Sequence, residues 1–235
     1  MLKLIIFDFD GVIADSEPAH FEMFRRILGE GGLNLTWKQY TENYLGFDDF
    51  NAFTQILKSR DLPHSPELVT QLCRKKEEKF AKYLQDKSVI FPGVKDLLQD
   101  LAKHQVPCSI YSGAIRSEIE FILTQANLSS FFTTLVSVED VQNPKPHPEG
   151  YSMTLEKTNQ LLNINSHSQP ILPDECLVIE DSGWGITSAK QANMFCLAVE
   201  QTYPASYLND ADRIVKDLTQ VNTDLLRQFV EGKNA

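Results

Sequence analysis

The chain has 235 residues and a formal net charge of −10, from 22 lysines and arginines and 32 aspartates and glutamates. Apolar residues make up 42% of the sequence and charged residues 23%, which excludes a disordered or collagen-like chain. At about 150 residues per domain, this length predicts one large domain or two modest ones. The acidic balance argues against a protein that binds nucleic acid or an anionic membrane, because both need a basic surface.

The cysteines and the apolar runs bear on the cellular compartment. Four cysteines lie far apart and form no C-x-x-C pair: Cys73, Cys108, Cys176 and Cys196. We expect them to be buried free thiols of a reducing compartment. No stretch approaches the roughly 20 apolar residues of a membrane span, and the N-terminal apolar run meets acidic residues too early for a signal peptide. These features predict a cytoplasmic protein with no membrane partner.

Short apolar runs that have the pattern of buried strands recur along the chain, at residues 2–7, 107–111, 134–138, 176–179 and 195–199. Stretches with apolar residues at helical spacing separate most of them, at residues 94–104, 115–126 and 148–162. Strands that alternate with helices in this way predict a parallel sheet covered on both faces. Residues 217–235 predict one closing helix and a frayed end.

One interval breaks this alternation, because residues 17–88 contain no convincing buried strand. Helical patterns occur there at 19–28, 49–57 and 66–84. We interpret the aromatic residues of the interval as the core of a helical unit: Trp37, Tyr40, Tyr44, Phe47, Phe50 and Phe53. The predicted fold class is therefore α/β. A Rossmann-like parallel-sheet core (residues 1–16 and 89–235) has helices on both faces and an inserted all-helical cap domain (residues 17–88).

Polar residues follow four of the predicted strands: Asp8, Asp10 and Gly11; Ser112 and Gly113; Lys145; Glu180 and Asp181. Ligands of open α/β sheets bind where the strands end at the carboxyl edge. Several carboxylates in one crevice need a cation, and oxygen ligands suit Mg²⁺. A hydroxyl, backbone N–H groups and a lysine suit the oxygens of a phosphoryl group. The sequence therefore predicts a magnesium-assisted phosphoryl site at this edge.

The pair Asp8 and Asp10 can divide the chemistry of phosphate-ester cleavage. One carboxylate can attack phosphorus while the other protonates the leaving oxygen. In an extended strand, side chains two residues apart share a face, so we expect both carboxylates to point into one site.

Four ordered segments, DFDGVIADSE, YSGA, NPKPHPE and VIEDSGWGITSAKQANM, resemble the motifs of the haloacid dehalogenase superfamily. The resemblance covers nearly the whole chain. The helical insertion resembles the cap of the branch that includes β-phosphoglucomutase, phosphoglycolate phosphatase and CbbY-like phosphatases. The resemblance implies a Mg²⁺-dependent phosphatase whose partner is a small phosphorylated metabolite, with a sugar phosphate as the expected substrate.

The resemblance also implies roles for the residues at the strand ends. Asp8 would be the nucleophile that forms an aspartyl-phosphate. Asp10 would protonate the leaving alkoxide and then activate water. Ser112 and Lys145 would hold the phosphoryl oxygens, and the turn at Gly113 would supply N–H groups.

The metal site follows from the same resemblance. The carboxylates of Asp8 and Asp181 and the backbone carbonyl of Asp10 would hold Mg²⁺. Glu180 would be a further or water-mediated ligand. The helical cap would close over the site, exclude water and recognise the rest of the substrate.

Three cap residues are candidates for substrate binding. His20 matches a histidine that lies near the leaving group in the β-phosphoglucomutase-like branch, and Glu17 lies beside it in the sequence. Lys76 stands where the mutase cap has a lysine, although the mixed-charge run around it is typical of a solvated helix face. Trp184 follows the metal motif, where small residues or proline are commoner, and either shapes the pocket or only packs.

Two other functions remain open alternatives. A hexose phosphomutase must hold a second phosphate at its cap, and β-phosphoglucomutase presents an arginine there just after a Gly-Val pair. This chain has Asp48 and Asp49 at that place, which favours a phosphatase. A non-catalytic phospho-ligand binding protein would be expected to have lost part of the catalytic set, which is intact here. The sequence leaves the oligomeric state open, and a monomer is compatible with it.

Overall fold

The computed structural model describes residues 1–85, 87–165 and 169–232. The chain divides into two compact units: Met1–Asp15 with Ile90–Ala235, which we call the core, and Ser16–Val89, which we call the cap. The insertion expected at residues 17–88 begins one residue after and ends one residue before these bounds. No helix among the described residues has both the length and the apolar character needed to cross a membrane.

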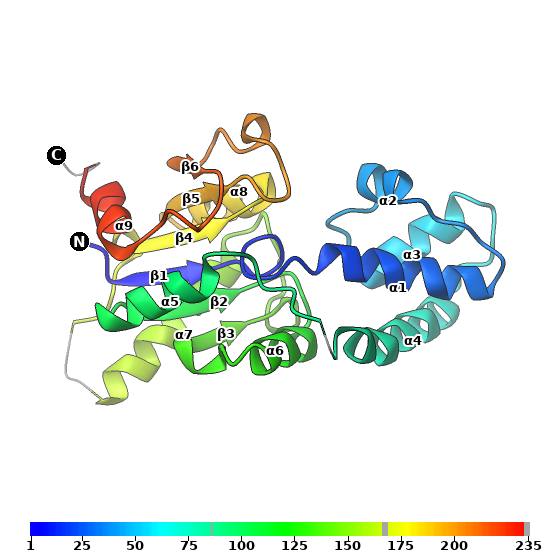
Figure 1. Cartoon of the computed structure of the whole chain (residues 1–235), viewed down its shortest axis with the longest axis horizontal. Coiled ribbons are helices and arrows are strands. Elements are labelled where there is room, and N and C mark those ends of the chain that lie inside the picture. Colours follow the sequence, from blue (N-terminus) through cyan, green and yellow to red (C-terminus); the bar gives the residue numbers. More distant parts are fainter. Residues whose placement is uncertain (86, 166–168, 233–235) are drawn as a thin grey trace. The chain divides into compact units, whose positions relative to one another are not determined.

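The core is built on a six-stranded parallel sheet with the strand order β3-β2-β1-β4-β5-β6 (Figure 1). Its strands are β1 (Leu4–Phe7), β2 (Cys108–Tyr111), β3 (Phe132–Val136), β4 (Cys176–Glu180), β5 (Phe195–Val199) and β6 (Arg213–Val215). The strand order reverses between β1 and β4. In open α/β sheets this reversal opens a crevice at the carboxyl ends of the strands, where ligands bind.

Helices cover both faces of the sheet. They are α5 (Val94–Lys103), α6 (Arg116–Gln125), α7 (Glu149–Asn165), α8 (Gly183–Gln191) and α9 (Thr223–Glu231). Leu4 and Ile6 of β1 share a core cluster with side chains of α7 and α8. Ile5 and Phe7 point to the opposite face and are fully buried there. The predicted parallel sheet with two covered faces is confirmed.

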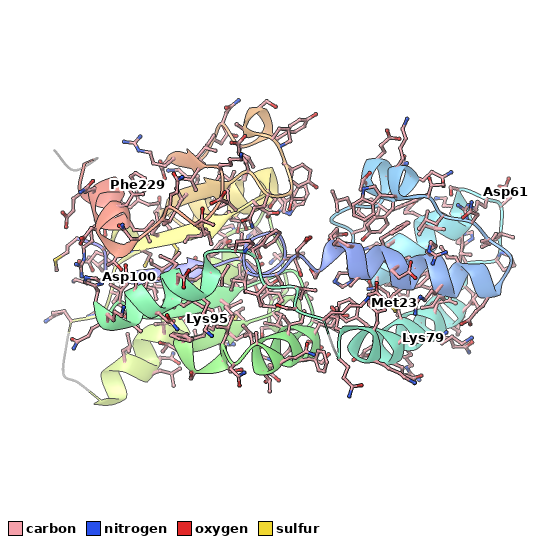
Figure 2. All side chains as sticks on the ribbon, viewed as in Figure 1. Met23, Asp61, Lys79, Lys95, Asp100 and Phe229 are labelled. Atoms are coloured by element: carbon pink, nitrogen blue, oxygen red, sulfur yellow. The ribbon has the colours of Figure 1, made fainter. Side chains whose placement is uncertain are left out.

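The closing helix is fixed by hydrogen bonds at its first turn. Asp100 of α5, labelled in Figure 2, accepts hydrogen bonds of 2.8 Å from both the N–H and the hydroxyl of Thr223. The side chain of Asn222 caps α9 by accepting from the N–H of Leu225. The helix therefore begins later than residue 217, where the sequence prediction starts. Residues 233–235 of the predicted frayed end lie outside the described residues.

Two elements of the core were not predicted, and β3 was predicted too late in the chain. The strand β6 has only three residues, none of them fully buried, so it lacks the apolar run that marks a buried strand. The helix α8 contains Gly183 and Gly185, and the low helix propensity of glycine is why the sequence did not predict a helix there. The strand β3 begins at Phe132 rather than at residue 134, and most of its residues are only partly buried.

The cap contains the helices α1 (Glu17–Glu30), α2 (Trp37–Asn43), α3 (Asp49–Lys58) and α4 (Pro66–Leu84). Side chains of Thr36, Asp48 and Ser65 cap the last three by accepting a backbone N–H. Figure 2 labels Met23 on α1 and Lys79 on α4; Met23 is fully buried, and Lys79 donates to Glu30 at the end of α1.

The cap core contains fewer aromatic residues than the sequence predicted. Tyr40 and Phe53 are buried in it beside Phe24. The prediction is wrong for three others, because the exposed fraction is 45% for Trp37, 49% for Phe47 and 42% for Phe50. An aromatic-rich segment does not by itself tell which rings face inward when its helices are short.

Candidate active site

Three carboxylates meet at the point where the strand order of the core sheet reverses. Asp8 directly follows β1, Glu180 is the last residue of β4, and Asp181 comes next. One oxygen of each lies within 4.8 Å of the others, and all three residues are buried. Each carboxylate stands at a strand end because two neighbouring parallel strands, β1 and β4, finish side by side.

Lys145 brings a positive charge between two of these carboxylates. Its Nζ lies 2.7 Å from Oδ1 of Asp8 and 2.6 Å from Oε1 of Glu180. The same atom is 5.1 Å and 5.4 Å from the ring centroids of Tyr111 and Tyr151. Burial by itself would lower the pKa of Lys145, but the two carboxylates outweigh it and raise the pKa above its ordinary value. The side chain is therefore a buried, permanently charged ammonium group.

Glu180 accepts hydrogen bonds on both oxygens. Oε1 accepts from Lys145 and, at 2.7 Å, from the hydroxyl of Tyr151. Oε2 accepts from the backbone N–H of Asp181 at 3.0 Å and from the N–H and hydroxyl of Ser182 at 3.2 and 2.9 Å. A carboxylate offers about four lone-pair sites. Five protein donors contact Glu180, so all of these sites are in use. Glu180 is therefore committed to protein donors.

Two glycines leave room for the carboxylates. Gly11 has a φ of +78°, and a Cβ there would lie 1.8 Å from Oδ2 of Asp181 and 2.5 Å from Oγ1 of Thr202. A Cβ on Gly185 would lie 1.8 Å from Oε1 of Glu180. Neither position accepts a side chain unless the acidic cluster moves.

The acidic cluster is short of positive charge. Burial raises the pKa of Asp8 to about 7, against the lowering effect of Lys145, and Glu180 raises it further. Burial, followed by the charges of Glu180 and Asp8, raises the pKa of Asp181 well above its ordinary value. Among the described residues, the Lys145 ammonium is the one that pairs with this cluster of three carboxylates, so a divalent cation would relieve the repulsion. Buried oxygen donors of this kind fit Mg²⁺.

Asp10 and Ser112 lie on neighbouring strand-end loops. The strand β1 ends at Phe7, so Asp8 and Asp10 lie in the loop beyond it and not in the extended strand. The charge of Asp10 nevertheless raises the pKa of Asp8, though less than burial does. Ser112 is buried at the end of β2, where its Oγ accepts from the N–H of Ala114 at 3.0 Å. Gly113, which lies between Ser112 and Ala114, is exposed.

The cap holds a separate cluster around Lys76. Its Nζ lies 2.5 Å from Oδ1 of Asp49 and 2.7 Å from Nδ1 of His20, and the residue is fully buried. The same atom is 4.8 Å from the ring centroid of Phe24. The interpretation of Lys76 as part of a solvated helix face is therefore wrong. Burial, together with the charge of Lys76, lowers the pKa of His20 well below its ordinary value, so the imidazole is neutral.

Several residues around these clusters were missed by the sequence reasoning. Tyr151 and Thr202 contact Glu180 and Asp181, yet nothing in their local sequence marks them. The sequence predicts that Asp49 repels an anion, whereas in the structure its carboxylate pairs with the buried Lys76. A lysine and an aspartate 27 residues apart give no periodic signal. Glu17, a predicted cap candidate, accepts a hydrogen bond from the hydroxyl of Tyr40.

Comparison with known proteins identifies the family. A sequence model of haloacid dehalogenase-like hydrolases matches residues 5–199. The chain belongs to this family. The validoxylamine A 7′-phosphate phosphatase of Streptomyces hygroscopicus subsp. limoneus is 27% identical over 221 residues, which cover 94% of this chain and 96% of that protein. The phosphorylated carbohydrates phosphatase of Thermotoga maritima is 26% identical, over 92% of this chain and 91% of that protein.

A solved structure has the same fold. The β-phosphoglucomutase of Clostridium difficile has a TM-score of 0.82 to this haloacid dehalogenase-like hydrolase, at 22% identity, over 100% of this chain and 99% of that chain. At this identity the likeness shows a shared fold. The resemblance inferred from the four motifs is confirmed, and with it the expectation that the chain is a hydrolase.

Proposed function

We propose that this haloacid dehalogenase-like hydrolase is a Mg²⁺-dependent phosphatase that hydrolyses a small phosphomonoester, with a sugar phosphate as the expected substrate. The observation that carries the proposal is the set of three buried carboxylates around the Lys145 ammonium at the end of β1 and β4. Two curated relatives of the chain are named as phosphatases, one of them of phosphorylated carbohydrates.

In the proposed reaction, an oxygen of Asp8 attacks phosphorus and the bond from phosphorus to the leaving oxygen breaks. Asp10 gives its proton to that oxygen, which leaves as an alcohol. Asp10 then takes a proton from water, which attacks phosphorus, releases phosphate and regenerates the Asp8 carboxylate. Splitting the hydrolysis into two displacements replaces one difficult step by two easier ones.

Other residues bind the phosphoryl group and the metal. We assign the phosphoryl oxygens to Lys145, the hydroxyl of Ser112 and the N–H groups of the turn at Gly113. Asp8, Asp181 and the backbone carbonyl of Asp10 would hold Mg²⁺, which supplies positive charge next to the transferring group. Both oxygens of Glu180 accept bonds from protein donors, so we propose that Glu180 does not ligate the metal and mainly orients Lys145.

The cap cluster favours a phosphatase over a hexose phosphomutase. A mutase needs a net positive charge in its cap for a second phosphate. Here the charge of Lys76 is matched by Asp49 at 2.5 Å. We propose that the buried Lys76 orients the neutral imidazole of His20, and that His20 and Glu17 contact the leaving alcohol.

The state of the cysteines supports a reducing compartment. All four are free, and Cys108, Cys176 and Cys196 are buried. None of these three is available to an exposed disulfide. We therefore assign the reaction to the cytoplasm.

The proposal predicts phosphate release from purified protein. In a panel of sugar phosphates, phosphoglycolate, nucleotides and an aryl phosphate, we expect Mg²⁺-dependent release that EDTA abolishes and added Mg²⁺ restores. The ranking of the panel would define the substrate class. Interconversion of glucose phosphates without net phosphate release would contradict the proposal and support the mutase. Folded protein that binds phosphate esters without converting any of them would support the non-catalytic alternative.

A further inference from the structure

Three aromatic side chains of the core form a partly exposed cluster. The ring centroid of Tyr203 lies 5.5 Å from that of Trp184 and 6.3 Å from that of Tyr207. Trp184 is 41% exposed and Tyr207 is 70% exposed, whereas Tyr203 is half-buried and packs against the core. Large aromatic rings that remain in solvent in this way are typical of a binding surface.

Both segments that carry this cluster also supply residues of the acidic site or contacts to it. Trp184 comes three residues after Asp181, in the first turn of α8. Tyr203 directly follows Thr202, whose hydroxyl donates a hydrogen bond to Asp181. The preceding residue, Gln201, donates from Nε2 to the carbonyl of Gly11 at 2.7 Å. The segment that carries Tyr203 and Tyr207 is therefore tied to the loop that holds Asp8 and Asp10.

The backbone beneath the cluster is well supported. Leu208, next to Tyr207, is fully buried in the core cluster. The N–H of Ala205 donates to the carboxylate of Glu200 at 2.8 Å, and the N–H of Tyr207 donates to the carbonyl of Pro204 at 2.9 Å. Backbone hydrogen bonds and the buried Leu208 therefore fix the positions from which the rings project into solvent.

The charges near the cluster are unsuited to an anion. The segment 200–210 contains no lysine or arginine and carries Glu200 and Asp210. A second phosphate or a carboxylate would be repelled here, whereas an uncharged ring would not.

We propose that Trp184, Tyr203 and Tyr207 form a subsite that stacks against an uncharged sugar ring in the alcohol portion of the substrate. The apolar face of such a ring fits an aromatic face, and the phenol hydroxyl of Tyr207 can hydrogen-bond to ring hydroxyls. The phosphate would bind at Lys145 while the ring lies on the aromatic cluster. This inference rests on the proposed phosphatase function and names the substrate class more narrowly.

Tryptophan fluorescence tests the subsite without turnover. The chain has two tryptophans, so Trp37→Phe leaves Trp184 as the single reporter, and Asp8→Asn in the same protein prevents hydrolysis. We expect glucose 6-phosphate to change the Trp184 emission saturably, and glycerol 3-phosphate, which has no ring, to bind without that change. With dissociation constants measured by isothermal titration calorimetry, Tyr207→Ala should raise that of glucose 6-phosphate about tenfold and leave that of glycerol 3-phosphate unchanged. Leu172→Ala, at an exposed apolar residue of the core, is the matched control and should change neither constant.

Three outcomes would overturn the subsite. The first is that glucose 6-phosphate binds without changing the Trp184 emission. The second is that Tyr207→Ala changes the dissociation constants of both esters equally. Emission that follows protein concentration instead of ligand would identify the cluster as a contact between two copies of the chain. Phosphate release by the unmutated protein is measured separately. If Trp184 responds but no phosphate is released, the subsite stands and the phosphatase fails.

Discussion

Replacing the candidate nucleophile by its amide, in Asp8→Asn, is expected to lower kcat by at least about 10⁴-fold. The amide has nearly the same shape as the carboxylate but cannot form a phosphoryl-enzyme, so the loss should appear in kcat rather than only in KM. Burial raises the pKa of Asp8 to about 7, so the native fold already tolerates an uncharged group at this position. Steady-state phosphate release, measured beside a urea unfolding curve, tests both statements.

The control for this variant is Asp174→Asn, which makes the same chemical change at an exposed aspartate of the core. It should keep the activity of the unmutated protein. An Asp8→Asn protein that retained full activity would remove Asp8 from the mechanism. One that failed to fold would instead assign Asp8 a structural role.

Removing the buried ammonium, in Lys145→Met, is expected to lower both activity and stability. Asp8 and Glu180 would then lack the cation that lies 2.7 and 2.6 Å away. Breaking a buried ion pair on one side typically costs about 3–5 kcal/mol of unfolding free energy. Phosphate release should fall to background, because the same ammonium is assigned to the phosphoryl oxygens. Urea unfolding at neutral pH measures the first effect.

The stability deficit of Lys145→Met should also depend on pH. The pKa of Asp8 is about 7 in the fold against 3.8 when unfolded, so ionising it destabilises the fold as pH rises through that interval. Without Lys145 the carboxylates lose the counter-charge that lowers the pKa of Asp8, so the deficit should grow as the pH rises through about 7, from pH 6 to pH 8. Lys145 itself stays charged throughout this range, because its folded pKa is raised.

A matched control for this variant exists at the surface. Lys190→Met breaks the pair with Asp212, in which the lysine is 40% exposed, and should cost about 1 kcal/mol or less with little pH dependence between those values. Equal deficits in the two variants would show that the Lys145 cluster gains nothing from being buried.

Much of the core could be predicted from its sequence because buried parallel strands leave a strong local signal. The run at 195–199 is fully apolar and coincides with β5, since both faces of that strand are covered. The strand β6 was not predicted, because three partly buried residues at a sheet edge give no apolar run. Local patterns reveal burial, so elements with little burial escape them.

The candidate site could be predicted in part, because the apolar runs that mark the strands also mark where the strands end. Asp8, Glu180 and Asp181 follow apolar runs, and the topology of parallel strands then brings them together. Lys145 follows β3 only after a further turn, and the distances that tie it to Asp8 and Glu180 come from tertiary packing. The hydrogen bond from Tyr151 to Glu180 could not be predicted either, because it depends on how α7 packs against the sheet.

The cap was predicted less well at the level of side chains. The mixed-charge run around Lys76 is what a solvated helix face contains, but this one lysine turns inward to Asp49 and His20. Charge composition along a helix does not tell which member is buried when its partner lies on another helix. Trp37 and Phe50 show the opposite error, because these apolar side chains were predicted to be buried and are exposed.

The most direct test of the mechanism is to trap the phosphoryl group on the protein. The protein is mixed with Mg²⁺ and the best substrate of the panel, quenched in acid during turnover, digested and analysed by mass spectrometry. We expect one added phosphoryl group on the peptide that contains Asp8, and none when EDTA is present or in Asp8→Asn. A phosphoryl group on any other residue, or steady phosphate release with no trapped adduct under these conditions, would contradict the assignment of Asp8 as the nucleophile.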